Sequence, residues 1–215
     1  GHDLAVEGGS RNYAKVEGTK YLNDSWSGTL AFEKNGFYLF PGSLYPTYMG
    51  NVASGTVNWK NNDNQKAFIG YQYWSLTDNN QQQAFAGYSQ KLITLYNFKL
   101  DGSLYVGNQQ NTNPNVGYFA PWNQTEYSGT AALEFLQWRD LSTKRYAFWH
   151  KLWGTYGVVT QQGFATLPMN TVGYGQNFDF GDRQRMTWGL GKTYFPFDGV
   201  RSNYLTGYLR FEKSF

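Results

Sequence analysis

The sequence contains no cysteine, only two histidines and no long apolar run. Without thiols the chain has neither disulfides nor thiolate metal sites, which suits a protein exported through the periplasm. No segment approaches the ~18 consecutive apolar residues that a membrane-spanning helix requires. The net charge is only +3 and the basic residues are scattered. The charge pattern therefore gives no support to nucleic-acid binding.

Catalytic motifs are also missing. There is no Gly-x-Ser-x-Gly elbow and no paired-histidine spacing. His150 lies in an aromatic segment, where we expect a structural or lumen-facing role rather than catalysis. Gly189-Leu190-Gly191 lies inside a strand pattern and does not open a helix, so it is not a phosphate loop. We therefore expect no enzymatic activity, no cofactor and no metal.

Aromatic residues, in contrast, are abundant. They make up 20% of the chain, with 18 Tyr, 16 Phe and 8 Trp, although the mean hydropathy is −0.60. A transmembrane β-barrel combines these two properties, because it needs a wet lumen, a lipid-facing surface and aromatic girdles at both interfaces. The alternative on composition alone is an aromatic-rich soluble β-sandwich or sugar-binding module.

The C-terminal segment shows a clear period of two. One face carries Phe215, Lys213, Phe211, Leu209, Gly207 and Leu205, and the other carries Ser214, Glu212, Arg210, Tyr208 and Thr206. This alternation predicts a strand with one apolar and one polar face. A strand that ends on a C-terminal Phe is typical of the closing strand of a bacterial outer-membrane barrel, in which the apolar face meets lipid. Lys213 is the exception, and near a rim its side chain can reach the headgroups.

Turn signals of two kinds alternate along the chain. Short signals fall at 35–36, 61–64, 101–102, 140–143 and 181–182, and other connections fall at 18–24, 46–51, 77–82, 109–125, 161–166 and 196–202. Short turns on one rim and longer loops on the other are typical of an up-and-down barrel. The spacing predicts an all-β, antiparallel transmembrane barrel of about 12 strands, within a range of 10 to 14, that forms a single domain over residues 1–215. Both termini are expected on the periplasmic rim.

Periodicity alone does not show which face of each strand points inward and which points outward. A soluble sandwich would show the same alternation with its bulky residues turned into the core. The terminal Phe and the alternating connections favour the barrel. Segment 146–159 is aromatic on both faces, so we expect some of its rings to point into the lumen or to pack against a plug-like loop.

The parity set by Phe215 also predicts which residues line the lumen. They are Glu134, Asn177, Asp179, Arg183, Arg185, Tyr204, Tyr208, Arg210 and Glu212. Mixed charges and Tyr side chains along a pore can hydrogen-bond to sugars and stack on their rings. The alternative is that the Arg and Glu side chains pair across the lumen and fill it, as in narrow barrels.

The C-terminal half resembles a known family of outer-membrane proteins. The similarity rests on Gly117-Tyr118-Phe119-Ala120-Pro121, Arg145-Tyr146, Gln161-Gln162-Gly163-Phe164, Thr166-Leu167-Pro168, Trp188-Gly189, Pro196-Phe197-Asp198-Gly199 and Gly207-Tyr208-Leu209. Their order and spacing from Gly117 to Phe215 resemble the barrel domain of the poly-N-acetylglucosamine export porins. The first half shows no such match. The resemblance implies passage of a polysaccharide across the outer membrane.

Together these observations predict a monomeric channel in the bacterial outer membrane that transports carbohydrate, with exopolysaccharide export as the first hypothesis. Its expected partners are membrane lipid, a polysaccharide or oligosaccharide, and periplasmic export components. Extracellular loops such as 109–125 are expected to gate the exit. Two alternatives remain: a small diffusion porin for oligosaccharide uptake, and a non-conducting barrel that acts as a scaffold or receptor.

Overall fold

The computed structural model describes residues 2–4, 10–12, 14–38, 48–62, 64–116, 119–140, 146–180 and 184–213. Within these residues no helix is long and apolar enough to cross a membrane. Strands β1 (His2–Leu4) and β2 (Ser10–Asn12) pair with each other in a small sheet. The large sheet consists of β3 (Ala14–Tyr21), β4 (Trp26–Tyr38), β5 (Tyr48–Asn61), β6 (Gln65–Leu76), β7 (Asn80–Thr94), β8 (Phe98–Asn111), β9 (Asn123–Arg139), β10 (Tyr146–Gln161), β11 (Leu167–Phe180), β12 (Gln184–Phe197) and β13 (Val200–Lys213).

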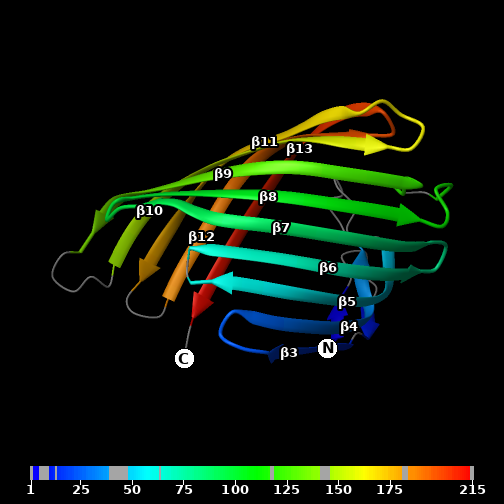
Figure 1. The fold of residues 1–215 in the computed structure, drawn as a ribbon, viewed down its shortest axis with the longest axis horizontal. Coiled ribbons are helices and arrows are strands. Elements are labelled where there is room, and N and C mark those ends of the chain that lie inside the picture. The colour runs from blue at the N-terminus through cyan, green and yellow to red at the C-terminus, as the bar shows by residue number, and fades with distance from the viewer. Residues whose placement is uncertain are drawn as a thin grey trace.

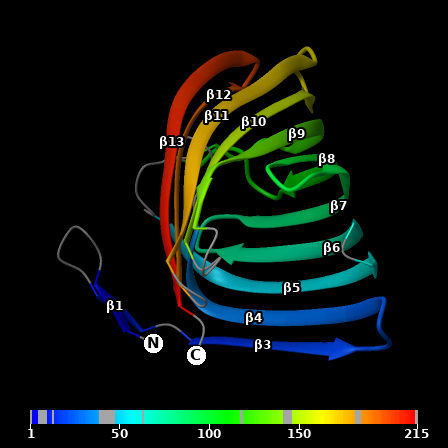
Figure 2. The ribbon, with the colours of Figure 1, turned by 90° about the vertical axis from the view of Figure 1, so that its left-hand side faces the viewer.

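The large sheet is a continuous antiparallel meander. Its eleven strands lie side by side in sequence order from β3 to β13, and the sheet curls along its length (Figures 1 and 2). Eleven strands fall within the predicted range and one below its central value. In the described residues no pairing joins β3 to β13, so the sheet is not closed. The periplasmic position of the termini stays a prediction.

The connections define two rims of the sheet. We call the rim where β3–β4, β5–β6, β7–β8, β9–β10 and β11–β12 are joined the hairpin rim. We call the opposite rim, which carries the β4–β5, β6–β7, β8–β9, β10–β11 and β12–β13 connections, the loop rim. The strands between the rims are mostly 12 to 17 residues long, longer than the ~9–11 residues that a tilted strand needs to cross a bilayer. Their ends therefore extend beyond the hydrocarbon core.

Four predicted connections differ from the structure. The 18–24 connection, predicted with the longer loops, lies on the hairpin rim, and its residues 18–21 belong to β3. Asn35-Gly36 lies inside β4, where Asn35 has a φ of 55° and the register shifts between Glu33 and Gly36. Asn-Gly favours hairpin turns because both residues tolerate a positive φ. Here the positive φ of Asn35 forms part of a β-bulge instead. Asp101-Gly102 lies inside β8 and is paired on both sides. The 196–202 loop is instead a two-residue turn at Asp198-Gly199, with φ values of 48° and 74°.

The strand register assigns each side chain to one face of the sheet, because directly paired residues point to the same side. Pairing aligns Trp153 with Gly173, Gly173 with Gly191, and Gly191 with Thr206. The concave face, followed in this way from β13 to β3, is rich in Thr, Ser, Gln, Gly and charged residues. The convex face carries exposed apolar side chains on most strands, namely Val16, Leu30, Ile69, Leu104, Tyr127, Tyr156, Val172, Leu190, Leu205 and Leu209.

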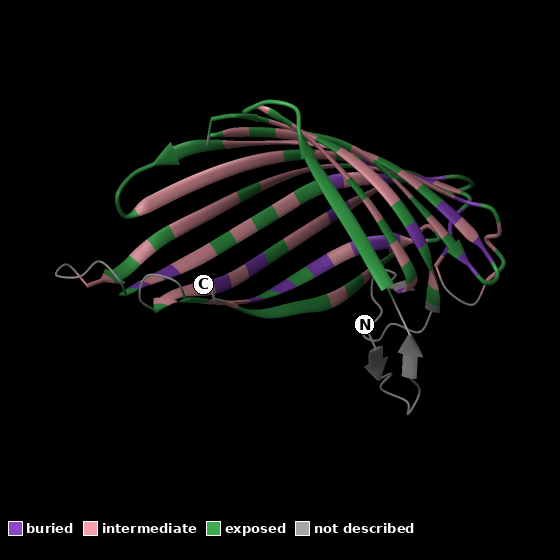
Figure 3. Cartoon of the chain, turned by 90° about the horizontal axis from the view of Figure 1, so that it is seen from below, coloured by how far each residue is buried: buried purple, intermediate pink, exposed green. Residues whose placement is uncertain are grey.

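This distribution is inverted relative to a soluble sandwich. Among the residues whose burial is described, few are buried, and none of the strands β3 to β13 is buried along its whole length (Figure 3). Because no described segment covers the apolar convex face, that face needs an apolar solvent, which lipid supplies.

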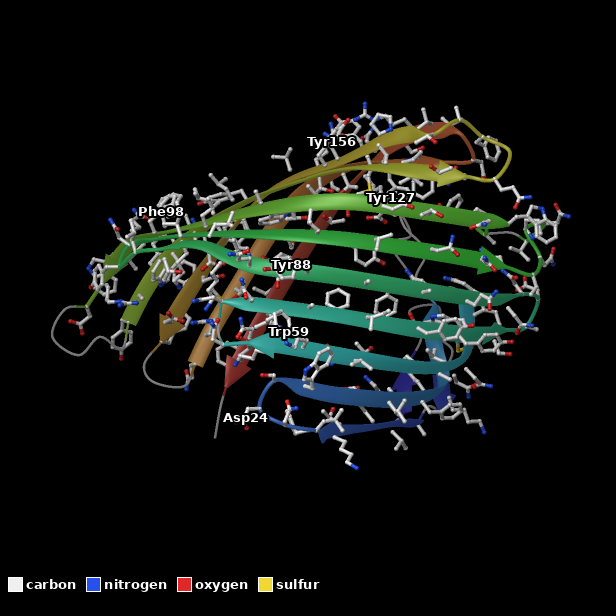
Figure 4. All side chains as sticks on the ribbon, viewed as in Figure 1. Asp24, Trp59, Tyr88, Phe98, Tyr127 and Tyr156 are labelled. Carbon is white, nitrogen blue, oxygen red and sulfur yellow. The ribbon has the colours of Figure 1, made fainter. Side chains whose placement is uncertain are left out.

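Aromatic residues mark both ends of the convex face. Trp59, which pairs with Trp26, and Phe98 lie next to hairpin-rim turns. Tyr127 and Tyr156 lie four and five residues from the loop-rim ends of their strands (Figure 4). Two aromatic belts at the ends of an apolar band are typical of the two interfaces of a membrane.

The assignment of the faces can be tested by placing one charge on each side of β8. Leu104→Arg puts the charge on the convex face and should lower the free energy of unfolding in phospholipid bilayers by about 2–4 kcal/mol. Ser103→Arg puts it on the concave face and should change that energy much less. Urea titration of the folded fraction in bilayers measures the free energy of unfolding of both variants. Equal destabilisation by the two variants would contradict the lipid-facing assignment.

Candidate functional site

The connection between β8 and β9 folds over the concave face. We call residues 112–122 the strap, of which 112–116 and 119–122 are described. On one side, Val116 and Ala120 pack with Trp74 and Leu76 of β6. The strap therefore leaves the loop rim and bends inward over the hollow of the concave face, which we call the trough.

The strap also contacts the far wall. Phe119 meets Phe197 of β12 edge-on, with ring centroids 4.9 Å apart. It belongs to a cluster with Val159, Met169, Phe195, Phe197 and Tyr204, which come from β10 to β13. Three strands lie between β6 and β10 in the sheet, so the strap spans the concave face from wall to wall. It crosses the concave face near the loop rim.

Two buried asparagines hold both ends of the strap. The Asn79 side-chain oxygen accepts hydrogen bonds from the backbone N–H of Thr112 at 3.1 Å and of Asn113 at 2.9 Å. Its Nδ2 donates to Oδ1 of Asn111 at 3.0 Å, and Nδ2 of Asn111 donates to the carbonyl of Pro121 at 2.7 Å. Because these groups are buried, each lost partner would leave an unsatisfied polar atom.

A polar cavity of about 290 Å³ lies on the concave face near this cluster. Its lining comes from strands β7, β8, β9, β11, β12 and β13 and consists of Gln83, Tyr105, Gly107, Gln109, Gln124, Glu126, Met169, Thr171, Thr193, Phe195 and Tyr204. Glu126 accepts a hydrogen bond from Ser128 at 3.0 Å. The cavity thus combines amides, hydroxyls, one carboxylate and aromatic rings, which are the groups that bind sugar hydroxyls and sugar ring faces.

Gln161 fixes the wall beside the cavity. It is 3% exposed, and its Nε2 donates to Gln124 Oε1 at 2.8 Å and to the Pro196 carbonyl at 3.2 Å. Its Oε1 accepts from the Gly199 N–H at 3.2 Å. One side chain therefore joins β9, β10 and the β12–β13 turn.

The predicted lumen residues that the structure describes share the concave face with this cavity. By register they are Glu134 on β9, Asn177 and Asp179 on β11, Arg185 on β12, and Tyr204, Tyr208, Arg210 and Glu212 on β13. Arg183 lies outside the described residues. Only Tyr204 lines the cavity itself. The role of the whole set in lining a pore stays a prediction.

The charged members pair along the wall. Asp179 and Arg185 bond across neighbouring strands at 2.7 Å, and Arg210 bonds Glu212 on the same strand at 2.7 Å. Glu134 lies 3.8 Å from each of two lysines, Lys99 on β8 and Lys151 on β10. In the described residues these charged side chains therefore pair between close neighbours on the wall, and an open or a filled lumen stays a prediction.

His150 lies on the convex face, so its lumen-facing alternative is wrong and its structural one fits. Its ring stacks on Phe135 with centroids 4.7 Å apart. Nδ1 bonds the Tyr174 hydroxyl at 2.5 Å, and Nε2 bonds Gln137. The described residues hold no group of three or more His, Asp or Glu that could bind a metal.

Sequence reasoning missed Glu126, Tyr105 and Trp153. Glu126 has the same parity as Glu134 on β9, so the period of two could have identified it. Trp149 and Trp153 lie on the concave face by register, as expected for a segment that is aromatic on both sides. The residues through which the strap makes its contacts follow no periodic pattern in the sequence, so the period of two could not identify them.

We predict that Asn79→Ala will loosen the strap. Removing the amide leaves the Asn113 N–H without its acceptor, whereas the Thr112 N–H keeps the Asn80 carbonyl at 2.9 Å. Hydrogen exchange at Asn113 should therefore become about 10- to 100-fold faster. Exchange measured in detergent by mass spectrometry or NMR tests this. Asn97→Ala, on the hairpin rim, is the matched control and should leave exchange at Asn113 unchanged. Wild-type exchange in Asn79→Ala would show that other contacts hold the strap.

Comparisons with known proteins agree with this architecture. The family model described as the PgaA membrane beta barrel domain matches residues 3–215. A solved structure entitled "Bacterial polysaccharide outer membrane secretin" superposes with a TM-score of 0.85 at 19% identity, covering 96% of this chain and 71% of that one. Among curated proteins, none matches the sequence. The chain belongs to the PgaA membrane β-barrel domain family, and its location is the bacterial outer membrane.

Proposed function

We propose that the chain forms the wall of an outer-membrane channel that exports a polysaccharide, with the polymer moving along the concave face and leaving past the strap. Family membership and the fold shared with a polysaccharide outer-membrane secretin support the proposal. The observation that carries it is the cavity beside the strap, where residues of β7 to β9 and of β11 to β13 meet in one polar, aromatic-lined space.

The chemistry of the wall favours a polymer of low charge. Acidic and basic groups on the concave face neutralise each other in pairs, as in Asp179–Arg185 and Arg210–Glu212. The cavity offers amides and hydroxyls, which exchange hydrogen bonds with a moving chain of sugars. Many weak, similar contacts let a polymer enter without trapping it, so transport needs no chemical step in this chain.

The strap is suited to gate the exit. It crosses the trough at the loop rim and is held by contacts on both walls. Those contacts are a few side chains and hydrogen bonds, which can open while the strands remain paired. Movement of the strap alone would change the width of the passage.

The function is tested by ion conductance in a planar lipid bilayer. We expect steady current through the wild-type protein, and block of that current by poly-N-acetylglucosamine oligomers but not by polyethylene glycol of equal size. Current that only other oligosaccharides block would favour a diffusion porin. Insertion without current would favour a scaffold or receptor barrel, and failure to insert would contradict a membrane channel.

The gating role makes a separate prediction for Phe119→Ala. Loss of the ring removes the edge-on contact with Phe197, so single-channel conductance should rise and closures should become rarer. Phe32→Ala, on the convex face of β4, is the control and should conduct as the wild type does. Unchanged conductance in Phe119→Ala would show that the strap does not limit the passage.

A further inference from the structure

The Trp153 side chain lies over three glycines on the concave face. It belongs to β10, and its indole extends over Gly173 of β11 and toward Gly189 and Gly191 of β12. A Cβ at Gly173 would overlap the indole, and a Cβ at Gly189 would lie 2.9 Å from Trp153 Cη2. At Gly191 the corresponding distance to Cζ2 is 3.5 Å. The indole therefore lies flat on the wall instead of standing out into the trough.

Glycine is needed at these positions for space. A glycine inside a strand destabilises it relative to alanine. Larger residues at Gly173 or Gly189 would push the ring away from the sheet. The indole covers these glycines with one face and keeps part of its surface exposed.

Tyr208 lies beside the indole, with its ring plane inclined by 43° to that of Trp153. Its ring centroid is 6.3 Å from that of Trp153, and a Cβ at Gly189 would lie 2.7 Å from its Cε1. Tyr208 remains 45% exposed. We call Trp153 and Tyr208 together the aromatic shelf.

Polar groups border the aromatic shelf on both sides. Toward the loop rim, the Thr130 and Thr155 hydroxyls bond at 2.7 Å, and those of Thr171 and Thr193 bond at 2.9 Å. Toward the hairpin rim, Lys151 lies two residues from Trp153 along β10. An apolar face flanked by hydroxyls and charge matches a pyranose, which has C–H groups on its ring face and hydroxyls around its edge.

The shelf also lies on the same path as the cavity. Thr171 and Thr193 line the cavity, and Gly173 and Gly191 follow one position further along the same face of β11 and β12. A polymer that extends from the cavity toward the hairpin rim therefore reaches the shelf.

We propose that the aromatic shelf is a sugar-stacking site, where Trp153 and Tyr208 bind the C–H face of one pyranose of the transported polysaccharide. The proposal rests on the proposed function and adds to it a defined binding step inside the channel. Recognition is through the ring face, so it requires no charge on the sugar.

The test compares Trp153→Ala and Trp153→Phe with Trp59→Ala, a convex-face control. In planar bilayers, Trp153→Ala should shorten the dwell time of poly-N-acetylglucosamine oligomers about tenfold, a change that corresponds to about 1.4 kcal/mol of lost ring stacking. Trp153→Phe keeps a smaller ring and should have an intermediate dwell time. Trp59→Ala should match the wild type.

The outcomes separate the two proposals. Wild-type channels that no oligosaccharide blocks would overturn the proposed function. Wild-type channels that are blocked, together with an unchanged dwell time in Trp153→Ala, would overturn the sugar-stacking site and leave the proposed function standing.

A second measurement covers the case in which Trp153→Ala does not insert. Oligosaccharide titration in detergent should change the tryptophan fluorescence of the wild type and of Trp59→Phe, and this change should be lost in Trp153→Phe. An equal change in Trp153→Phe would overturn the site.

Discussion

The constraint on which the whole structure depends is that lipid offers no hydrogen bonds to the backbone. Each backbone N–H and C=O within the bilayer must find a partner in the protein, and long antiparallel ladders between sequence neighbours provide it. The meander from β4 to β12 satisfies this on both edges of every strand. In the large sheet as described, the outer edges of β3 and β13 have no neighbouring strand. These strands are an even number of steps apart and run in the same direction, so an antiparallel seam between them requires an odd number of further strands.

The same constraint explains why the protein has little core. Strand alternation sends one half of the side chains to lipid and the other half to the trough, so few residues are enclosed. Burial is concentrated where the chain folds back on itself, in the clusters around Leu76 and Val159. Gln161 adds three hydrogen bonds at the same rim. The loop rim is thus fixed by packing, whereas the middle of the wall is fixed by its backbone ladder.

Side-chain size on the concave face then decides what the channel can hold. Threonine and glutamine keep the wall polar, and glycines let one large ring lie flat on it. The strap occupies the loop-rim end and the aromatic shelf lies further along the wall. Several charged side chains of the concave face pair with close neighbours on the wall, as Asp179 does with Arg185 and Arg210 with Glu212.

The sequence by itself determined the all-β class, a strand number close to the observed one, and the polar and apolar faces of β11 to β13. These depend on a period of two, which is a local property of the chain. It also carried a resemblance to the family over residues 117–215. What it could not determine depends on register and on contacts between distant segments. Asn35-Gly36 has the local preference of a turn, yet the pairing of β4 with β5 makes it a bulge. The strap crosses the trough because it packs on β6 and β12, and Trp153 lies flat because register brings three glycines beneath it. Only the tertiary structure sets such positions, since nothing in the local pattern relates one strand to the residues that come to lie beside it.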